Sequence, residues 1–266
     1  MIQRRYVSGR FGQVHLRESG AGTGKLPLVC LHATAYSSRS FEALMRALGP
    51  ARHVIAIDLP GYGESDPPNT ALDIAGYAEA VAEAIVAAVG SQPVALFGYH
   101  TGVVIAAEIA LQGQVTVAAM TLLGVPFFEV LDLEMWRAKL AGRHALGDSL
   151  DQFTERWDFL VTNRPAGLPL RRGFENFVDE LKAWPDGPAA HHALFAYDLR
   201  ARFALLDCTV TILNSEGHLA GASRAAAGLI PGAQVIELPQ LHGAVLDTAA
   251  ETIAALIPSA AESCRS

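Results

Sequence analysis

The chain has 266 residues, of which 51% are hydrophobic, and its formal net charge at pH 7 is −7. A chain of this length and composition can bury a sizeable core, so we expect one α/β domain with an insertion, or two small domains. The sequence contains no basic block and no apolar run of about 18 residues. We therefore expect neither a nucleic acid nor a membrane as partner.

The N-terminal segment MIQRRYVSGRFG has basic residues, but the apolar run of a secretory signal does not follow them. The three cysteines, Cys30, Cys208 and Cys264, lie far apart, and the first two fall in apolar, strand-like runs. Reduced, buried thiols are usual in that setting. We therefore expect a cytoplasmic protein.

Short apolar runs alternate with segments of helical periodicity along most of the chain. Residues 3–20 alternate around a glycine, which predicts a β-hairpin. Continuous apolar runs predict buried strands at 26–33, 53–60, 93–100, 117–126, 208–216 and 233–239. Helical spacing predicts helices at 37–48, 72–89, 101–111, 219–230 and 244–257. This alternation predicts an α/β fold with a mostly parallel, twisted sheet and helices on both faces.

The alternation stops between residues 127 and 203, where no strand-like run occurs and where all three tryptophans lie. Proline and glycine interrupt the amphipathic segments of this stretch. We predict a helical insertion at 127–203, a core built from 1–126 and 204–258, and a frayed tail at 259–266.

Four segments resemble motifs of the α/β-hydrolase superfamily, in the order that this family has, and most closely its cap-bearing esterase, dehalogenase and lyase branch. They are LVCLHATAYSSRSFEAL at 28–44, VIAIDLPGYGESDPP at 54–68, LFGYHTG at 96–102 and LPQLHGAVLD at 238–247. The resemblance covers nearly the whole chain. It implies an α/β-hydrolase fold, with the insertion as a cap over the active site and His242 as the catalytic histidine.

The sequence departs from the family pattern at three places. His100 stands where the G-x-S-x-G motif has its nucleophilic serine. Ala33 stands where the oxyanion segment usually has glycine, and Gly217 stands at the aspartate position of the acid segment, with Glu216 one residue earlier. The serine-type triad of the family is therefore not present as such.

The glycines at positions 98 and 102 keep side chains out of a tight strand-to-helix turn, whatever residue stands between them. The resemblance implies that this turn directs residue 100 into the pocket. It also implies that the N–H groups of Thr34 and Thr101 form an oxyanion hole. The hydroxyl of Thr101 is a less favoured rival nucleophile.

Three roles stay open for His100. It could attack the substrate to form an acyl-imidazole, exchange protons in a pair with His242, or be a relic in a protein that only binds a ligand. We favour proton exchange, because imidazoles titrate near neutral pH. Glu216 is our candidate for the acceptor that orients His242. A metal site formed by His100, His242 and either Glu216 or His218 is disfavoured, because no metal-ligand spacing occurs.

The predicted insertion is rich in aromatic and basic side chains that could cover the pocket. They are Trp136, Arg137, Arg143, His144, Trp157, Trp184, His191, His192 and Tyr197. We expect most of them on the helix surface or in a small core of the cap. The alternative is a pocket roof that accepts an aromatic or carboxylate-bearing substrate, with an arginine as its clamp.

The sequence thus predicts an α/β-hydrolase-fold enzyme that acts on a small carbonyl compound such as an ester, a lactone or a β-keto substrate. A non-hydrolytic lyase or isomerase on the same fold, and a catalytically silent ligand-binding protein, are the alternatives. No metal and no cofactor are expected, because no G-x-G-x-x-G follows a strand and GYGES does not fit a P-loop. The expected partner is a small-molecule substrate, and formation of a homodimer is left open.

Overall fold

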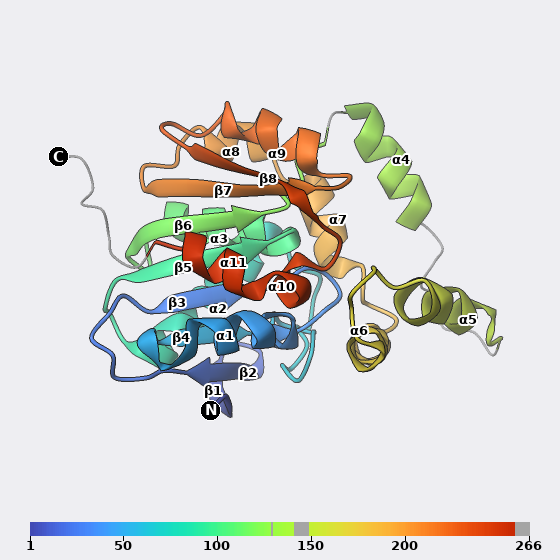
Figure 1. Ribbon diagram of the computed structural model, residues 1–266, viewed down its shortest axis with the longest axis horizontal. Coiled ribbons are helices and arrows are strands. Elements are labelled where there is room, and N and C mark those ends of the chain that lie inside the picture. The colour runs from blue at the N-terminus through green and yellow to red at the C-terminus, as the bar shows by residue number, and fades with distance from the viewer. Residues whose placement is uncertain (129, 141–148, 259–266) are drawn as a thin grey trace.

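The computed structural model describes residues 1–128, 130–140 and 149–258 of the chain. At their centre is an eight-stranded sheet in the order β1-β2-β4-β3-β5-β6-β7-β8 (Figure 1). The strands are β1 (Gln3–Gly9), β2 (Gly12–Ser19), β3 (Leu28–Leu31), β4 (Val54–Ile57), β5 (Val94–Tyr99), β6 (Val117–Leu123), β7 (Thr209–Glu216) and β8 (Gln234–His242). The β1–β2 and β2–β4 pairs are antiparallel and every other pair is parallel. The predicted mostly parallel sheet is therefore confirmed.

Helices cover both faces of this sheet. In Figure 1, α1, α10 and α11 lie in front of the strands, and α2 and α3 lie behind them. The helices are α1 (Glu42–Leu48), α2 (Ile74–Val89), α3 (Thr101–Gln112), α4 (Val130–Leu140), α5 (Asp151–Trp157), α6 (Leu170–Lys182), α7 (Ala189–Ala196), α8 (Leu199–Phe203), α9 (Ala220–Ala227), α10 (Val245–Thr248) and α11 (Ala250–Leu256). Short 3₁₀ turns flank α1 at Ser38–Phe41 and Gly49–Ala51, and a π-helical turn at Asp158–Thr162 continues α5.

Strands β3 to β7 contribute side chains to two apolar cores, because successive side chains of a strand point to opposite faces of the sheet. In β3, Val29 and Leu31 pack in the core that contains α2 and α3. Leu28 and Cys30 pack in the other core, with α1 and α11. Cys30 and Cys208 are buried free thiols, as expected, whereas Cys264 and the predicted tail at 259–266 lie outside the described residues.

Between β6 and β7 the described residues form α4 to α8 without a strand. Figure 1 shows α4, α5 and α6 at one side of the sheet. Polar contacts anchor this segment to α3, where Glu108 accepts hydrogen bonds from Tyr197 Oη at 2.9 Å and from Arg202 Nη2 at 2.8 Å. A second anchor is Tyr62, whose hydroxyl donates to Gly187 O at 3.0 Å.

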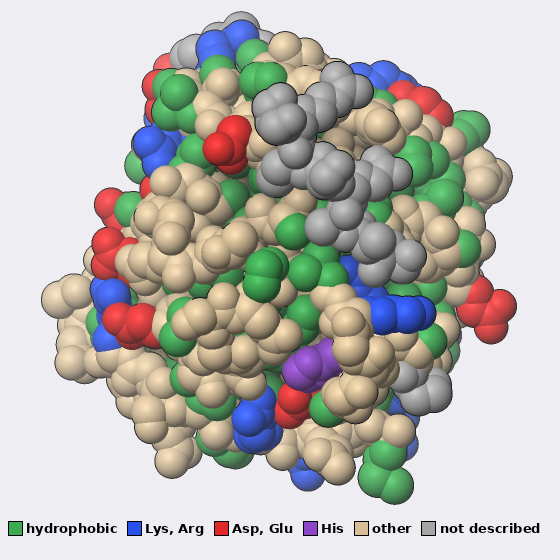
Figure 2. Space-filling view, turned by 90° about the vertical axis from the view of Figure 1, so that its left-hand side faces the viewer, with side chains coloured by type: hydrophobic (Ala, Val, Ile, Leu, Met, Phe, Trp, Pro, Cys, Tyr) green, Lys and Arg blue, Asp and Glu red, His purple; other side chains and the backbone are tan. Residues whose placement is uncertain are grey.

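The opposite side of the molecule, on the left in Figure 1, faces the viewer in Figure 2. Acidic and basic side chains are interspersed on this face. It therefore presents no extended field of a single sign. Among the helices of the described residues, none has the length and apolar character needed to cross a membrane.

Helix α3 lies against β3 and β5 at a distance that only glycine permits. A Cβ atom on Gly102 would lie 2.1 Å from Leu31 O, and one on Gly98 would lie 2.6 Å from Val103 Cα. Both neighbours are backbone atoms, which cannot rotate away as a side chain can. The two glycines therefore set how closely the helix approaches the sheet.

We expect Gly102→Ala to lower the free energy of unfolding by about 3 kcal/mol, because the new methyl group forces the backbones apart. Gly221→Ala is the matched control, because Gly221 lies in α9 and no atom within 4 Å would meet its Cβ. That control should gain up to about 1 kcal/mol from helix propensity. Urea unfolding of both variants makes the measurement, and equal stabilities would contradict the close-packing argument.

Candidate active site

The segment between β5 and α3 is a sharp turn with His100 at its apex. His100 has φ 49° and ψ −114°, and it is the one described residue other than glycine with a positive φ. Its N–H donates to Leu123 O at 3.0 Å, and its carbonyl oxygen accepts from Val103 N at 2.9 Å. Backbone strain of this kind persists where the surrounding structure enforces it, and it clusters at functional sites. The turn thus fixes the imidazole at the end of β5.

A cavity of about 400 Å³ lies at the carboxyl ends of β5, β6 and β7, where open α/β sheets bind ligands. Its wall includes His100, the loop that follows β7, residues 243–247 and the inner face of α6. A second hollow of about 100 Å³ is lined mainly by aromatic and aliphatic side chains. His100, His218 and Leu219 border both spaces. We call the two spaces the large and the small compartment.

The imidazole of His100 is uncharged at neutral pH. Burial, helped by the charges of His218 and His191, lowers the pKa of His100 to about 3. The ring centroids of His100 and His218 are 5.9 Å apart, which is within reach of one bridging water molecule. The absent side chain of Gly124 makes room for the ring, since a Cβ there would lie 2.8 Å from His100 Nε2.

The two residues predicted for the oxyanion hole lie side by side. Thr34 Oγ1 donates to Thr101 Oγ1 at 2.8 Å, and this bond ties the loop after β3 to the first residue of α3. Thr101 is buried and borders the small compartment. The first N–H groups of a helix have no partner within the helix. An oxyanion hole built from the N–H groups of Thr34 and Thr101 stays a prediction.

A buried hydrogen-bond network holds the loops beneath these threonines. His32 Nδ1 bonds to Ala33 O at 2.9 Å, and its Nε2 accepts from Leu59 N at 2.9 Å. Asp58 accepts from His15 Nδ1 at 2.8 Å and from the N–H groups of Ser38 at 2.6 Å and residue 64 at 2.9 Å. Burial raises the pKa of Asp58, but these hydrogen bonds outweigh it and lower the pKa to about 2. His32 and Asp58 therefore position loops.

The two other predicted catalytic residues lie at the ends of neighbouring strands. Glu216 ends β7, is exposed, and borders the large compartment. His242 ends β8 and is paired with Glu216 in the strand register. Its side chain is exposed and borders neither compartment, as far as the described residues show. The ring contact that the structure shows for His100 is with His218, and the pairing of His100 with His242 stays a prediction.

His218 occupies the place beside His100 that was expected for His242. It lies on the loop between β7 and α9, and its ring centroid is 6.5 Å from that of Trp136 on α4. The sequence alone placed His218 only among weak metal candidates. The available signal was its position directly after Gly217, where the family has its catalytic acid.

Among the predicted cap residues, Trp136 and His191 border the small compartment. Arg143 and His144 lie outside the described residues. The arginine that borders the large compartment is Arg172 on α6, which the sequence pattern did not single out. Its Nε lies 3.3 Å from Asp247 Oδ1.

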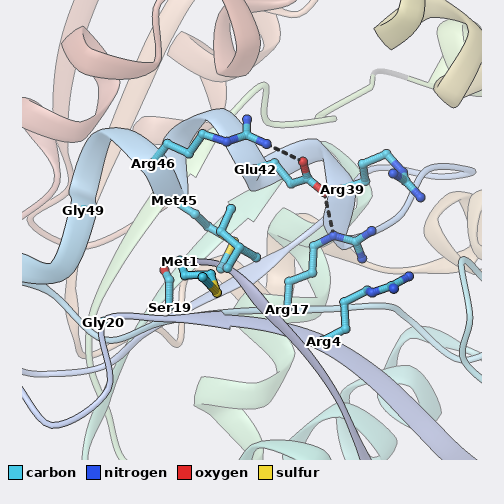
Figure 3. Close-up of a pocket in the computed structure, with 11 residues that line it drawn as sticks. Met1, Arg4, Arg17, Ser19, Gly20, Arg39, Glu42, Met45, Arg46 and Gly49 are labelled. Atoms are coloured by element: carbon cyan, nitrogen blue, oxygen red, sulfur yellow. Dashed lines mark hydrogen bonds and ion pairs between the residues drawn. The ribbon is translucent and has the colours of Figure 1, made fainter.

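Another hollow opens between α1 and the β1–β2 hairpin (Figure 3). Glu42 stands between two of its arginines, accepting from Arg17 Nε at 2.9 Å and from Arg46 Nη2 at 2.7 Å. The residues around this hollow include no histidine and no cysteine, and none of them borders the large compartment. It therefore offers ion pairs that join α1 to β2, not the groups for acyl transfer. Within the described part of the chain, no group of three or more His, Cys, Asp or Glu side chains is placed to hold a metal ion.

Comparisons with known proteins identify the fold. A family model described as alpha/beta hydrolase fold matches residues 27–203. A search of curated proteins finds no match to the chain.

Similar solved structures include a lipase from Acinetobacter baumannii AYE, described as putative, with a TM-score of 0.78 and 18% identity over 96% of this chain and 89% of that one. A thermophilic esterase from Thermogutta terrifontis has a TM-score of 0.74 and 18% identity, with 95% and 96% of the two chains covered. Est816, described as an N-acyl homoserine lactone degrading enzyme, has a TM-score of 0.74 and 19% identity, with 95% and 98% covered. At these identities the likeness concerns the fold.

Because the pKa of His100 is low in the folded protein, we expect the free energy of unfolding to fall as the pH is lowered. Between the unfolded value of 6.5 and the folded value of about 3, the unfolded chain binds a proton that the folded chain does not. Lowering the pH from 6.5 to 5 should therefore cost roughly 2 kcal/mol through this residue. Urea unfolding of the wild type and of His100→Gln at both pH values measures it. An equal loss in the two proteins would contradict a buried neutral imidazole.

Proposed function

This chain belongs to the α/β-hydrolase-fold family, and we propose that it hydrolyses the ester or lactone bond of a small carbonyl compound. The family match confirms the prediction of an enzyme with the hydrolase fold. The observation that carries the proposal is the imidazole of His100, held by a strained turn between two compartments and accompanied by His218. The names of the similar structures, which include an esterase and a lactone-degrading enzyme, favour this bond type.

His100 acts in this proposal as a neutral group. A ring with a pKa of about 3 carries almost no positive charge at pH 7, so it is a weak base. A neutral imidazole still has one N–H donor and one nitrogen acceptor. It can therefore hold a water molecule or polarise a carbonyl oxygen without forming a covalent intermediate.

His218 supplies the proton exchange. Its side chain is exposed, so solvent protons can reach it. A water molecule gives a proton to the His218 imidazole while its oxygen adds to the carbonyl carbon, and the π electrons move to the carbonyl oxygen. The N–H groups of Thr34 and Thr101 stabilise that oxyanion. When the tetrahedral adduct collapses, the C–O bond breaks and the leaving alkoxide takes the proton from His218.

Histidine variants test this assignment. We expect His100→Ala and His218→Ala to lower kcat/KM for short-chain p-nitrophenyl esters and lactones by about 100-fold or more, the usual share of acid–base catalysis. His192→Ala is the matched control, because His192 is exposed on α7 and borders neither compartment. It should keep the wild-type rate.

The variant His242→Ala tests whether His218 or His242 is the histidine that acts together with His100. The exposed position of His242 predicts a rate within about threefold of the wild type, whereas the family pattern predicts a loss as large as that of His100→Ala. If the folded wild type turns over no ester and no lactone, the hydrolytic function is wrong. Activity that appears only in His100→Ser would then show an intact scaffold with a different natural reaction.

A further inference from the structure

Helix α6 turns a polar face toward the protein. Its buried residues include Arg172, Asn176 and Asp179, at helical spacing, whereas Leu170 and Phe174 are exposed. A surface helix normally buries its apolar stripe and exposes its polar one. Buried polar groups need hydrogen-bond partners, because an unpaired one costs free energy. The reversed face of α6 therefore needs polar partners from the rest of the protein or from a ligand.

The protein itself satisfies only part of this face. Asp179 accepts from Ser37 Oγ at 2.6 Å, and Arg172 is paired with Asp247. Nη1 of Arg172 has no hydrogen-bond partner, and it lies 3.7 Å from Glu175 Oε2. Oδ1 of Asn176 also lacks a partner.

Two more residues that line the same space each hold an unpartnered polar atom. These atoms are Ser40 Oγ, before α1, and Asn214 Oδ1, on β7. With Arg172 and Asn176 they make four residues that are each at least nine-tenths buried, and all four line the large compartment. Unsatisfied buried polar atoms are rare in folded proteins, so four around one cavity indicate a built binding surface.

The types of these four atoms define the ligand. The guanidinium of Arg172 donates, the side-chain oxygens of Asn176 and Asn214 accept, and the hydroxyl of Ser40 can do either. A matching group must therefore both donate and accept, as a hydroxyl does. Burial raises the pKa of Tyr99 to about 12, so a further protonated hydroxyl borders the compartment.

The charge of the compartment argues against an anionic ligand. The positive charge of Arg172 is offset by Asp247, and Glu216 adds a further carboxylate to the wall. A carboxylate entering this space would meet no excess positive charge. The expectation of an arginine clamp for a carboxylate-bearing substrate is therefore not supported by the surroundings of Arg172.

The small compartment combines large apolar side chains with the polar side chains of His100, Thr101, His191 and His218. Phe128, Trp136, Leu194 and Phe195 line it, and its volume is about 100 Å³. A cavity of roughly 150 Å³ with similar apolar walls holds benzene, so this one suits a shorter chain of a few carbons. His100 and His218 stand where the two compartments meet.

We propose that the substrate is an uncharged ester or lactone that joins a short apolar chain to a hydroxylated group. The short chain occupies the small compartment, and the hydroxylated group bonds to Ser40, Arg172, Asn176 and Asn214 in the large one. This inference rests on the proposed hydrolytic function, because it places the carbonyl group at His100 and His218.

Matched esters test the preference. Glycerol monobutyrate and propyl butyrate share one acyl chain and differ by two hydroxyls on the alcohol. We expect the wild type to favour glycerol monobutyrate in kcat/KM by at least about tenfold. Ser40→Ala and Asn176→Leu should each reduce this ratio about three- to tenfold, chiefly through the KM for glycerol monobutyrate. Asn69→Leu, at an exposed position before α2, is the control and should keep the wild-type ratio.

A binding measurement separates this inference from the catalytic one. The monobutyl ether of glycerol cannot be hydrolysed, and its binding can be followed by calorimetry in the wild type and in Asn176→Leu. Binding that weakens in Asn176→Leu, without turnover of any ester, would support the hydroxylated ligand and overturn the hydrolytic function. Turnover of both butyrates at equal kcat/KM, unchanged by Ser40→Ala and Asn176→Leu, would overturn the substrate inference and leave the function standing. If neither turnover nor binding occurs, both proposals are wrong.

Discussion

The close approach of α3 to β3 and β5 is the constraint on which the rest of the site depends. Gly102 lets the first turn of the helix rest against the carbonyl oxygen of Leu31, and Gly98 lets the end of β5 bend beneath Val103. The residue between β5 and α3 then has no conformation open to it except a positive φ, whatever its side chain. His100 therefore stands between the two compartments because the backbone puts it there.

The histidine at the apex of this turn changes the charges that surround the reacting groups. The wall around the apex holds two further imidazoles, His191 and His218, and no carboxylate among the groups that shift the pKa of His100. Burial thus meets no compensating negative charge, and the ring stays neutral. A serine-type mechanism uses a histidine that becomes positively charged and is stabilised by an acid. Here the exposed His218 is the imidazole that can exchange protons with solvent.

The helices between β6 and β7 complete the site in two ways. Helix α4 supplies Trp136 to the apolar wall, and α6 supplies Arg172 and Asn176 to the polar wall. The anchor at Glu108 joins this segment directly to α3, the helix whose start forms the turn. The binding surface and the reacting groups are therefore positioned by one connected set of contacts.

The local pattern of the sequence was sufficient to predict the strands, the helices and the turn at His100. Continuous apolar runs marked the buried strands, because a parallel sheet covered on both faces needs apolar side chains on both. The spacing of Gly98, His100 and Gly102 marked the elbow, because close packing there leaves no other residue for the flanking positions.

Only the tertiary structure decided which side chains meet in the cavity. His242 and His218 both follow strands of the sheet, and the sequence favoured the former, yet the ring that lies near His100 is that of His218. The contacts of the polar face of α6 could not be predicted either. A helical pattern shows which residues share a face, but it does not show which parts of the protein that face contacts. Strand register and the packing of α6 join residues far apart in the chain, and local periodicity carries no information about such contacts. That is the physical reason why the elements could be predicted from the sequence and the partners within the site could not.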